Sequence, residues 1–521
     1  MPKTTVSAPR ASTSGVDDRA TTRGARPVAS ARRFLSPVAV GLLGLAISLA
    51  GIGTPSVWYD ESATIISATR SWEQLWAMIG TVDAVHALYY AGMHLVFDVV
   101  GYSPVSLRVP SAIAVAVAAA LTVVLGRVLD RPRLGLIAGI VFCLLPRTTW
   151  MGTEGRSYAA TAALAVLLTI LLVLASRSTR RVLWALYAVA VVVSVLLFVY
   201  LALVVAAHAL TMAVWLASTR SRAWPPAARW LRWAGAATLL VVPFALAVVA
   251  QSGQLHWLDR PDAGTVRGVL VRQWFFTSVP FAVVGWLLIA AGAAVLLRRA
   301  RGLSVASVVL PALVLPTVAL LVISLTVTPI YTPRYLAMCL PFVALVMAAA
   351  LDRLRPRAVT VLALAALAAL ALPQIAEQRE PQAKEHTSWA AVADLVASER
   401  AADGPGSQTA VVYGNVARHP IASTRVIAYS YPEAFEGTID VTLGTPAAET
   451  DGLWETRIPL AEGLPRLVAA DVVYLVTSTT RDRRAETTET LADAGWRVTE
   501  EWNLSEVNVL RYERDTAPLV Q

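Results

Sequence analysis

The chain is poor in charge, in lysine and in cysteine. Only 15% of its 521 residues are charged, whereas a soluble domain carries about a quarter, so a water-soluble globular protein is excluded. Lysine occurs only at Lys3 and Lys384. The two cysteines, Cys143 and Cys339, both lie in apolar stretches and provide neither a disulfide framework nor a metal cluster. The sequence also lacks a P-loop and a dinucleotide fingerprint, which argues against an ATP-driven pump.

Long apolar runs are what the chain has instead. Hydrophobic residues make up 56% of it and the mean hydropathy is +0.59, and apolar runs of this length predict membrane-spanning helices. We therefore expect a multi-span α-helical membrane protein with about eleven transmembrane helices. The predicted spans are 34–53, 108–126, 134–151, 157–175, 182–199, 201–218, 233–251, 281–297, 303–326, 335–351 and 358–373.

Charge sorts the loops between the two sides of the membrane. Residues 1–33 have the composition of a disordered cytoplasmic tail. Arginine clusters between the spans fall on one side only if residues 83–101, which carry Asp83 and His86, form a helix on the membrane surface instead of crossing. The loop 54–107 is then one large external loop of a plasma-membrane protein.

The last part of the sequence changes character. Residues 374–521 are more highly charged, and they alternate helix-like and strand-like stretches. Ser388–Arg400 has the pattern of an amphipathic helix, and Thr409–Tyr413, Asp471–Val476 and Val507–Tyr512 have that of strands. We expect an extracytoplasmic α/β domain here.

Acidic residues gather in the loops assigned to the outside. Of the 35 acidic residues only twelve precede residue 374, and eight of those lie in external loops. Asp60 and Glu61 directly follow Trp58 and Tyr59 after the first span, and Glu154 also lies at a helix end. Carboxylates near hydrocarbon are costly and usually functional. The pattern predicts an acid-lined external cavity, with ordinary loop solvation as the alternative.

Three external arginines oppose the usual charge bias. Arg108, Arg156 and Arg334 each lie at an external helix end, where a guanidinium can hold a phosphate with two hydrogen bonds. A snorkelling arginine that meets lipid phosphates non-specifically is the alternative. In the 252–280 loop, His256 and Trp257 could stack on a sugar or serve as interfacial residues.

These residues occur in motifs whose order resembles the C-type (GT-C) integral membrane glycosyltransferases. The motifs are the acidic pair, Asp83-Ala-Val-His-Ala-Leu-Tyr-Tyr90, Leu107-Arg-Val-Pro-Ser111, Glu154-Gly-Arg-Ser-Tyr158 and Tyr331-Thr-Pro-Arg-Tyr335. Within that family the order is most similar to the protein mannosyltransferase and lipid A aminoarabinose transferase branch. The resemblance covers residues 34–350 and says little about residues 374–521.

The resemblance implies a role for each matched position. Asp60, with Glu61 beside it, matches the family's aspartate that serves as base or acceptor ligand. Arg108 lies near the donor phosphate, with Arg156 and Arg334 as further phosphate ligands. Substrate contacts fall to Asp83, His86, Tyr89, Glu154, Tyr158, Tyr331 and Tyr335. The family's two prolines after the histidine are missing here, and so is an aspartate after Tyr158, whose charge Glu154 is expected to supply.

The expected activity is inverting transfer of a sugar from a polyprenyl-phosphate donor to an external hydroxyl, with no cofactor and no metal. Mannose is the favoured sugar, with a pentose-phosphate donor as the alternative, and the acceptor is a lipoglycan, a cell-wall glycan or an exported protein. Two other functions stay open. A transporter of a lipid-linked sugar would favour polar residues at the bilayer midplane. A non-catalytic envelope-assembly protein would give the acidic and basic residues no function.

Overall fold

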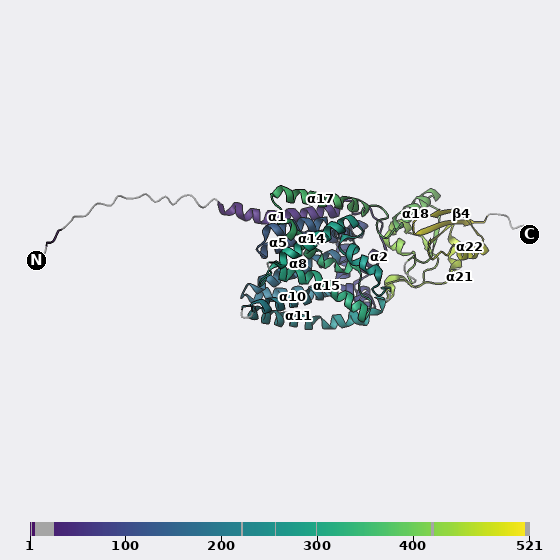
Figure 1. Ribbon diagram of the computed structural model, residues 1–521. Helices are drawn as coiled ribbons and strands as arrows, with labels where there is room; N and C mark the ends of the chain where they lie inside the picture. The colour runs from purple at the N-terminus through teal and green to yellow at the C-terminus, as the bar shows by residue number, and fades with distance from the viewer. Residues whose placement is uncertain are drawn as a thin grey trace, which may run out of the picture.

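A helical bundle and a smaller α/β domain, joined end to end, make up the computed structural model (Figure 1). The structure describes residues 1, 3–5, 25–219, 222–255, 257–298, 300–417 and 421–515. His256 and most of the predicted tail lie outside these ranges, and helix α1 begins at Ala25, within the segment predicted as tail.

All eleven apolar stretches form helices, so the predicted multi-span helical fold is confirmed. Eight helices in the described ranges are long and apolar enough to cross a membrane, and Leu35–Leu49, Pro132–Leu144 and Arg181–Leu197 are shorter apolar helices. The exact number of crossings stays a prediction. The helices are α1 (Ala25–Leu49), α5 (Pro104–Val128), α6 (Pro132–Leu144), α8 (Tyr158–Ser176), α9 (Arg181–Leu197), α10 (Ala202–Thr219), α11 (Trp224–Ala250), α14 (Val279–Leu297), α15 (Val305–Thr326), η5 with α16 (Pro333–Cys339 and Leu340–Leu351) and α17 (Arg357–Glu377).

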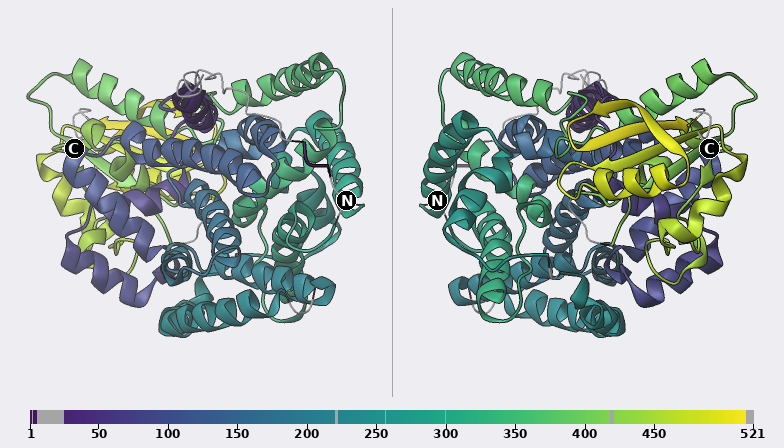
Figure 2. Two further views of the ribbon diagram at one scale, coloured as in Figure 1. Left: turned by 90° about the vertical axis from the view of Figure 1, so that its left-hand side faces the viewer. Right: turned by 90° about the vertical axis from the view of Figure 1, so that its right-hand side faces the viewer.

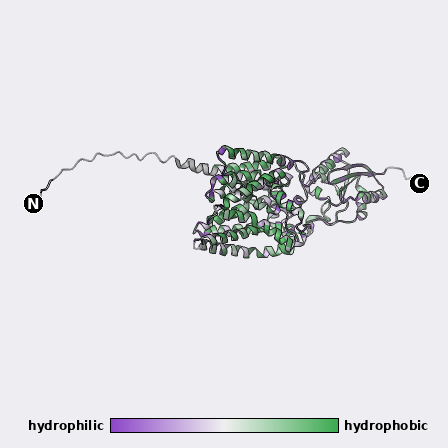
Figure 3. Cartoon of the chain, in the orientation of Figure 1, coloured by the Kyte–Doolittle hydropathy of each residue, from purple (hydrophilic) through white to green (hydrophobic). Residues whose placement is uncertain are grey.

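The centre of the bundle is α16, which is buried along almost its whole length. Glycines allow its neighbours to approach closely. A Cβ on Gly292 of α14 would lie 1.9 Å from the carbonyl oxygen of Val346 in α16, and one on Gly126 of α5 would lie 2.2 Å from the Cα of Gly135 in α6. Such small-residue contacts are typical of membrane helices. Apolar residues fill the bundle, and polar residues gather towards the α/β domain (Figure 3).

The first loop is folded rather than irregular. It contains α2 (Tyr59–Ala68), α3 (Trp72–Thr81), the single turn η1 (Ala84–His86) and α4 (Ala87–Val100). Helix α4 buries one side, including Tyr90 and Phe97, and exposes Leu95 and Val99 on another. This amphipathic helix occupies the segment predicted to lie on the membrane surface, and that placement stays a prediction.

The C-terminal domain is built on a five-stranded sheet in the order β2-β1-β3-β5-β4. Strands β1, β2 and β3 are parallel, whereas β5 and β4 are antiparallel to their neighbours. The predicted helix and the three predicted strands are present, as α18 (Trp389–Asp403), β1 (Thr409–Tyr413), β3 (Val472–Ser478) and β5 (Val507–Arg514). Two further strands, β2 (Ile439–Asp440) and β4 (Trp496–Asn503), form the edges. The other helices are α19 (Val426–Ser430), α20 (Pro432–Phe435), α21 (Leu460–Gly463) and α22 (Arg484–Asp493).

The C-terminal domain sits over the first loop at one end of the bundle (Figure 2). The backbone N–H of Val57 donates to the Tyr431 hydroxyl at 2.9 Å, and the Tyr102 hydroxyl donates to the Ser430 carbonyl at 2.7 Å. Arg70 is buried and donates to carbonyls of the domain, at 2.8 Å for Thr450. Loop and domain therefore form one layer over the bundle end where the candidate site lies.

Candidate active site

The acidic pair opens helix α2. Trp58 is extended, the helix begins at Tyr59, and Asp60 and Glu61 occupy its first turn, where carboxylates stabilise a helix. The two side chains have different surroundings. That of Glu61 is fully buried, whereas that of Asp60 keeps 13% of its surface exposed.

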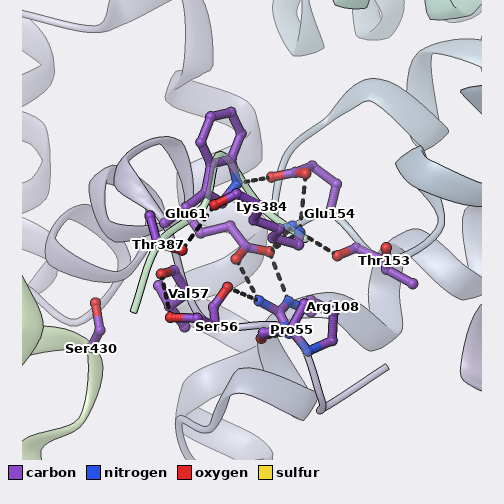
Figure 4. A network of polar contacts seen from close by, with 12 residues as sticks. Pro55, Ser56, Val57, Glu61, Arg108, Thr153, Glu154, Lys384, Thr387 and Ser430 are labelled. Carbon is purple, nitrogen blue, oxygen red and sulfur yellow. Dashed lines mark hydrogen bonds and ion pairs between the residues drawn. The ribbon is translucent and has the colours of Figure 1, made fainter. Parts of the chain in front are cut away.

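Glu61 is bound to Arg108 in a sealed pair. The Arg108 Nε donates to Glu61 Oε1 at 2.8 Å, and Nη2 donates to Oε2 at 2.7 Å. The three remaining N–H groups point to the carbonyls of Ile52, Pro55 and Ser56 at 2.8–3.1 Å (Figure 4). Neither side chain has exposed surface. A guanidinium has five N–H donors, so every one of them is used within the protein.

Lys384 extends this cluster from the other end of the chain. Its ammonium donates to Glu61 Oε1 at 2.9 Å, to Glu154 Oε2 at 3.0 Å and to the Thr153 carbonyl at 2.6 Å (Figure 4). The Trp58 indole N–H donates to the other oxygen of Glu154 at 2.6 Å. Two carboxylates thus face one arginine and one lysine, so their formal charges cancel where water cannot screen them.

The two carboxyls of the cluster have opposite pKa shifts. Burial raises the pKa of Glu61, but Arg108 and Lys384 outweigh it and bring the value down to about 2. Burial raises the pKa of Glu154 to about 7, with Glu61 adding to the rise and Lys384 opposing it. Glu154 is therefore the weaker acid of the two.

Asp60 meets Arg334 on the less buried side of α2. The Arg334 Nη1 lies 3.1 Å from Asp60 Oδ2, and 17% of the arginine side chain is exposed. The guanidinium also lies against two tryptophan rings, 5.6 Å from the centroid of Trp58 and 5.3 Å from that of Trp257. This pair joins residues 274 positions apart and, unlike the Glu61–Arg108 pair, retains access to solvent.

Arg156 lies beside this pair in a second polar group. Its Nη1 donates to the Tyr90 hydroxyl at 3.0 Å, and its Nη2 lies 3.1 Å from His86 Nε2. Tyr90 in turn donates to Asp83 Oδ2 at 2.8 Å. Burial raises the pKa of Asp83, and burial together with Arg156 and Arg334 lowers the pKa of His86 well below its usual value.

Several buried polar atoms in this region have no hydrogen-bond partner. They are His86 Nδ1, Arg156 Nε and Arg334 Nε, whereas Asp60 Oδ2 has no hydrogen bond but faces Arg334 Nη1 in the ion pair. An unpaired buried polar atom is costly unless a ligand or water satisfies it. All three belong to the two polar groups around Asp60 and Arg156, where a polar ligand could supply the missing hydrogen bonds.

Aromatic rings pack together close to these polar groups. The Tyr335 ring stacks on that of Tyr200 with 5.3 Å between the ring centroids, and its centroid lies 6.4 Å from that of Tyr158. Tyr89 is buried next to Tyr90, with ring centroids 6.5 Å apart. Tyr331 lies farther along the loop, where its hydroxyl donates to Gln273 at 3.0 Å.

The structure thus divides the predicted site residues into two sets. Asp60, Arg334, Arg156, His86 and Asp83 are brought together around unpaired polar atoms. Glu61, Arg108 and Glu154 belong instead to the sealed cluster, the fully buried group that they form with Lys384. In this structure all five donors of Arg108 are used within the protein and Glu61 has no exposed surface. The phosphate-binding role of Arg108 and the role of Glu61 as a base stay predictions.

Two buried cations were not identified from the sequence. Lys384 is the only lysine outside the N-terminal segment, and that isolation was a usable signal. Arg147 lies in a predicted span that ends early, because α6 stops before Pro146 and the short helix α7 (Pro146–Met151) follows. Its guanidinium lies 4.8 Å from the Trp150 ring and 4.9 Å from that of Phe276. An arginine inside an apolar stretch is itself a functional signal.

A metal site does not emerge from the described ranges, where no three His, Cys, Asp or Glu side chains are placed to hold an ion. The requirement for a metal or cofactor is not tested by this observation, and its absence stays a prediction.

Comparison with known proteins supplies the fold family. No protein-family profile and no curated protein sequence matches the chain. Among solved structures, apo ArnT from Cupriavidus metallidurans superposes with a TM-score of 0.60 at 14% identity, covering 93% of this chain and 98% of that one. ArnT bound to undecaprenyl phosphate gives a TM-score of 0.56 at 13% identity with the same coverage. The resemblance drawn from the sequence motifs is confirmed for the fold: this chain has the architecture of the GT-C membrane glycosyltransferases.

Proposed function

We propose that this protein is a plasma-membrane glycosyltransferase that moves a sugar from a polyprenyl-phosphate donor to an extracytoplasmic hydroxyl. The observation that carries the proposal is the Asp60–Arg334 pair, which joins a carboxylate and a guanidinium at 3.1 Å in a partly exposed position surrounded by unpaired polar atoms. The GT-C fold and the undecaprenyl phosphate bound by ArnT support this donor class.

In the proposed reaction Asp60 is the general base. Its carboxylate takes the proton of the acceptor hydroxyl while that oxygen bonds to the anomeric carbon of the sugar. The bond between that carbon and the phosphate oxygen breaks on the opposite face, so the configuration inverts. The phosphate leaves with the electron pair, and Arg334 and Arg156 stabilise its charge.

An apolar groove could bind the lipid part of the donor. It has a volume of about 670 Å³ and follows α15, with α10 as its other wall; Leu210, Val314 and Val322 are among its lining residues. Helix α15 leads through residues 327–332 directly to Arg334. A polyprenyl chain in this groove would therefore have its phosphate end near the arginines.

The proposal also specifies which sugar is transferred and which acceptor receives it. We propose mannose as the sugar and a lipoglycan, cell-wall glycan or exported protein as the acceptor, without a metal or cofactor. The sequence resemblance to the protein mannosyltransferase branch supports mannose, and the site must be tested with that donor first.

The test compares wild type with Asp60→Asn in membranes given radiolabelled polyprenyl-phosphate mannose. Loss of the base should lower transfer by roughly 10²–10⁴-fold. The matched control is Glu73→Gln, because Glu73 is an exposed acid in the neighbouring helix α3 and should transfer like wild type. Equal transfer by Asp60→Asn and wild type would remove Asp60 as the base. No transfer by wild type from any polyprenyl-phosphate sugar would favour the transporter or assembly functions.

A further inference from the structure

Arg147 is a buried cation outside the set of residues assigned to the proposed reaction. It lies in α7, the short helix that begins at Pro146 after α6 ends, and only 6% of its surface is exposed. Arg108 and Arg334 each pair with a carboxylate, whereas Arg147 pairs with none in the described part of the chain. A buried charge without a partner is costly, so an anionic ligand would stabilise this one.

The guanidinium of Arg147 has N–H groups left for such a ligand. Its Nε donates to the Arg272 carbonyl at 3.1 Å, and its Nη2 donates to the same oxygen. A guanidinium carries five N–H donors, so three of them, including both on Nη1, make no hydrogen bond to the described residues. Free donors on a planar fork suit a phosphate, whose oxygens can accept two hydrogen bonds from it.

Two aromatic rings hold this guanidinium in place. Its Cζ atom lies 4.8 Å from the centroid of the Trp150 ring and 4.9 Å from that of Phe276. Phe276 has a φ of 57°, in the left-handed region that bulky residues rarely adopt, and strained backbone of this kind concentrates at ligand sites. Cation–π attraction holds the charge but offers no oxygen to its N–H groups. The rings therefore fix the arginine without satisfying it.

Arg147 lies beside the site around Arg334. Helix α7 packs against η5, the segment that carries Arg334. The Trp150 ring stacks on that of Tyr158 with 5.8 Å between the centroids, and the Tyr158 centroid lies 6.4 Å from that of Tyr335. The ionisable side chains that act on the charge of Arg147 are those of Arg334, Tyr158, Tyr331 and Glu154. All four are predicted site residues, so Arg147 belongs to the same polar region.

Hydrogen bonds also connect the segment around Arg147 to the apolar groove. Arg272, whose carbonyl accepts from Arg147, is followed by Gln273, and the Gln273 side chain donates to the Thr317 hydroxyl at 2.9 Å. Thr317 belongs to α15, which forms one wall of the groove. The Tyr331 hydroxyl donates to the same glutamine at 3.0 Å. Arg147 is thereby fixed to the helix that runs from the groove towards the site.

The charges of this region favour a further anion. Arg147, Arg156 and Arg334 are three cations, and Asp60 is the one carboxylate that pairs with any of them among the described residues. Asp83 reaches Arg156 only through the Tyr90 hydroxyl. Even with Asp83 counted as charged, the three cations face two carboxylates. The sealed cluster is neutral by itself and does not change this balance.

The proposed reaction creates an anion of the required kind. A polyprenyl-phosphate sugar is a phosphodiester with one negative charge. When the bond between the anomeric carbon and the phosphate oxygen breaks, the electron pair stays on that oxygen, and the polyprenyl phosphate leaves with a second negative charge. Cations already in place where this charge develops stabilise it.

From this geometry we infer that Arg147 is a phosphate-binding residue of the donor site and holds the leaving polyprenyl phosphate. The assignment rests on the proposed function, because a leaving phosphate presupposes transfer. It adds a residue that none of the sequence motifs contains, and it explains why an arginine with free donors is buried at the break between α6 and α7.

The first test measures binding of undecaprenyl phosphate to the full-length protein in detergent by microscale thermophoresis. Undecaprenol, which lacks the phosphate, and inorganic phosphate, which lacks the lipid, are the comparison probes. We expect undecaprenyl phosphate to bind at least about tenfold more tightly than either. Equal affinity for undecaprenol would show that no phosphate is recognised, and equal affinity for inorganic phosphate would show that the ligand is not a lipid; either result overturns the inference.

Variants assign the phosphate recognition to Arg147. Arg147→Gln removes the charge and should weaken binding of undecaprenyl phosphate by at least about tenfold, with the affinity for undecaprenol unchanged. Arg133→Gln is the matched control, because Arg133 lies at the opposite end of α6 and also donates to a carbonyl, that of Leu354; it should bind like wild type. Unchanged phosphate binding by Arg147→Gln, or an equal loss for both lipids as a structural role would produce, overturns the inference.

Arg147→Lys provides a second variant that keeps the positive charge in the protein interior. An ammonium lacks the two-pronged donor of a guanidinium, so we expect binding of undecaprenyl phosphate to weaken by at least about threefold while the affinity for undecaprenol stays unchanged. If Arg147→Gln fails to fold, this variant decides, and wild-type affinity for undecaprenyl phosphate in Arg147→Lys then overturns the inference.

Transfer kinetics separate failure of this assignment from failure of the proposed function. With an active donor, undecaprenyl phosphate is a product inhibitor, and Arg147→Gln should raise its inhibition constant by at least about tenfold and lower kcat. Transfer with an unaltered inhibition constant would overturn the role of Arg147 and keep the enzyme. Phosphate-specific binding that Arg147→Gln abolishes, without transfer by wild type, would keep the phosphate-binding residue and overturn the enzyme.

Discussion

Replacing Lys384 with methionine tests the sealed cluster most directly. The ammonium makes three hydrogen bonds, to Glu61, Glu154 and the Thr153 carbonyl, at 2.6–3.0 Å. In the variant Glu61 keeps Arg108, but Glu154 Oε2 is left buried without a cation. Removing one member of a buried ion pair costs about 3–5 kcal/mol. With a shift of roughly 2 °C per kcal/mol, Tm should fall by roughly 6–10 °C.

The pH dependence of that deficit identifies its cause. Burial already raises the pKa of Glu154 to about 7 in the intact protein, and the loss of Lys384 should raise it further. At low pH the carboxyl is neutral and leaves no unpaired charge. The difference in Tm between wild type and Lys384→Met should therefore shrink towards pH 5 and widen towards pH 8.

The assay is thermal unfolding of the detergent-solubilised protein followed by intrinsic tryptophan fluorescence. Arg353→Met, which removes an exposed cation from the loop before α17, is the control and should leave Tm unchanged. Adding Glu154→Gln to Lys384→Met removes the unpaired charge and should restore at least about half of the loss. A Tm equal to that of wild type, or additive losses in the double variant, would refute the reasoning.

Three further predictions follow from the same contacts. Because the folded-state pKa of Glu154 is raised from 4.5 to about 7, its contribution to stability is present below pH 4.5 and lost as pH rises through 7, so Glu154→Gln should flatten the decline of Tm between pH 5 and 8. Arg334→Gln should lower transfer by roughly 10²-fold with little change in Tm, whereas Arg108→Gln should lower Tm by roughly 6–10 °C and reduce the folded yield. Gly292→Ala should lower Tm because its Cβ would lie 1.9 Å from a carbonyl oxygen of α16, whereas Gly92→Ala, with nothing within 4 Å, should not; equal Tm values would contradict this packing.

The helices were predictable because their determinants are local. Each apolar stretch satisfies its backbone hydrogen bonds within itself, so hydropathy alone locates it. The boundaries depended on single residues such as Pro146, which ends one helix and begins another. In the C-terminal domain the buried strands β1 and β3 are continuous apolar runs, whereas β4 is largely exposed and gives little apolar signal.

The partners of the site residues were less accessible to sequence reasoning. Arg334, Arg156 and Asp60 were recognisable in the sequence because charged residues at the ends of apolar helices are uncommon and often functional. Which acid meets which base depends on packing between segments far apart. Lys384 lies 323 residues from Glu61, and only the path of the connection after α17 brings it into the cluster.

The neighbouring acids Asp60 and Glu61 point in different directions from the helix and therefore have different surroundings. Successive residues of an α-helix point about 100° apart, so an acidic pair at the start of α2 cannot face a single partner. Glu61 turns inward to Arg108 and Lys384, which hold its pKa at about 2 and keep it charged without exposure. This buried pair fixes the first turn of the helix. Asp60, one residue earlier, is thereby oriented towards Arg334 at the edge of the site. The buried acid positions the helix, and the partly exposed acid is the one that we propose as the general base.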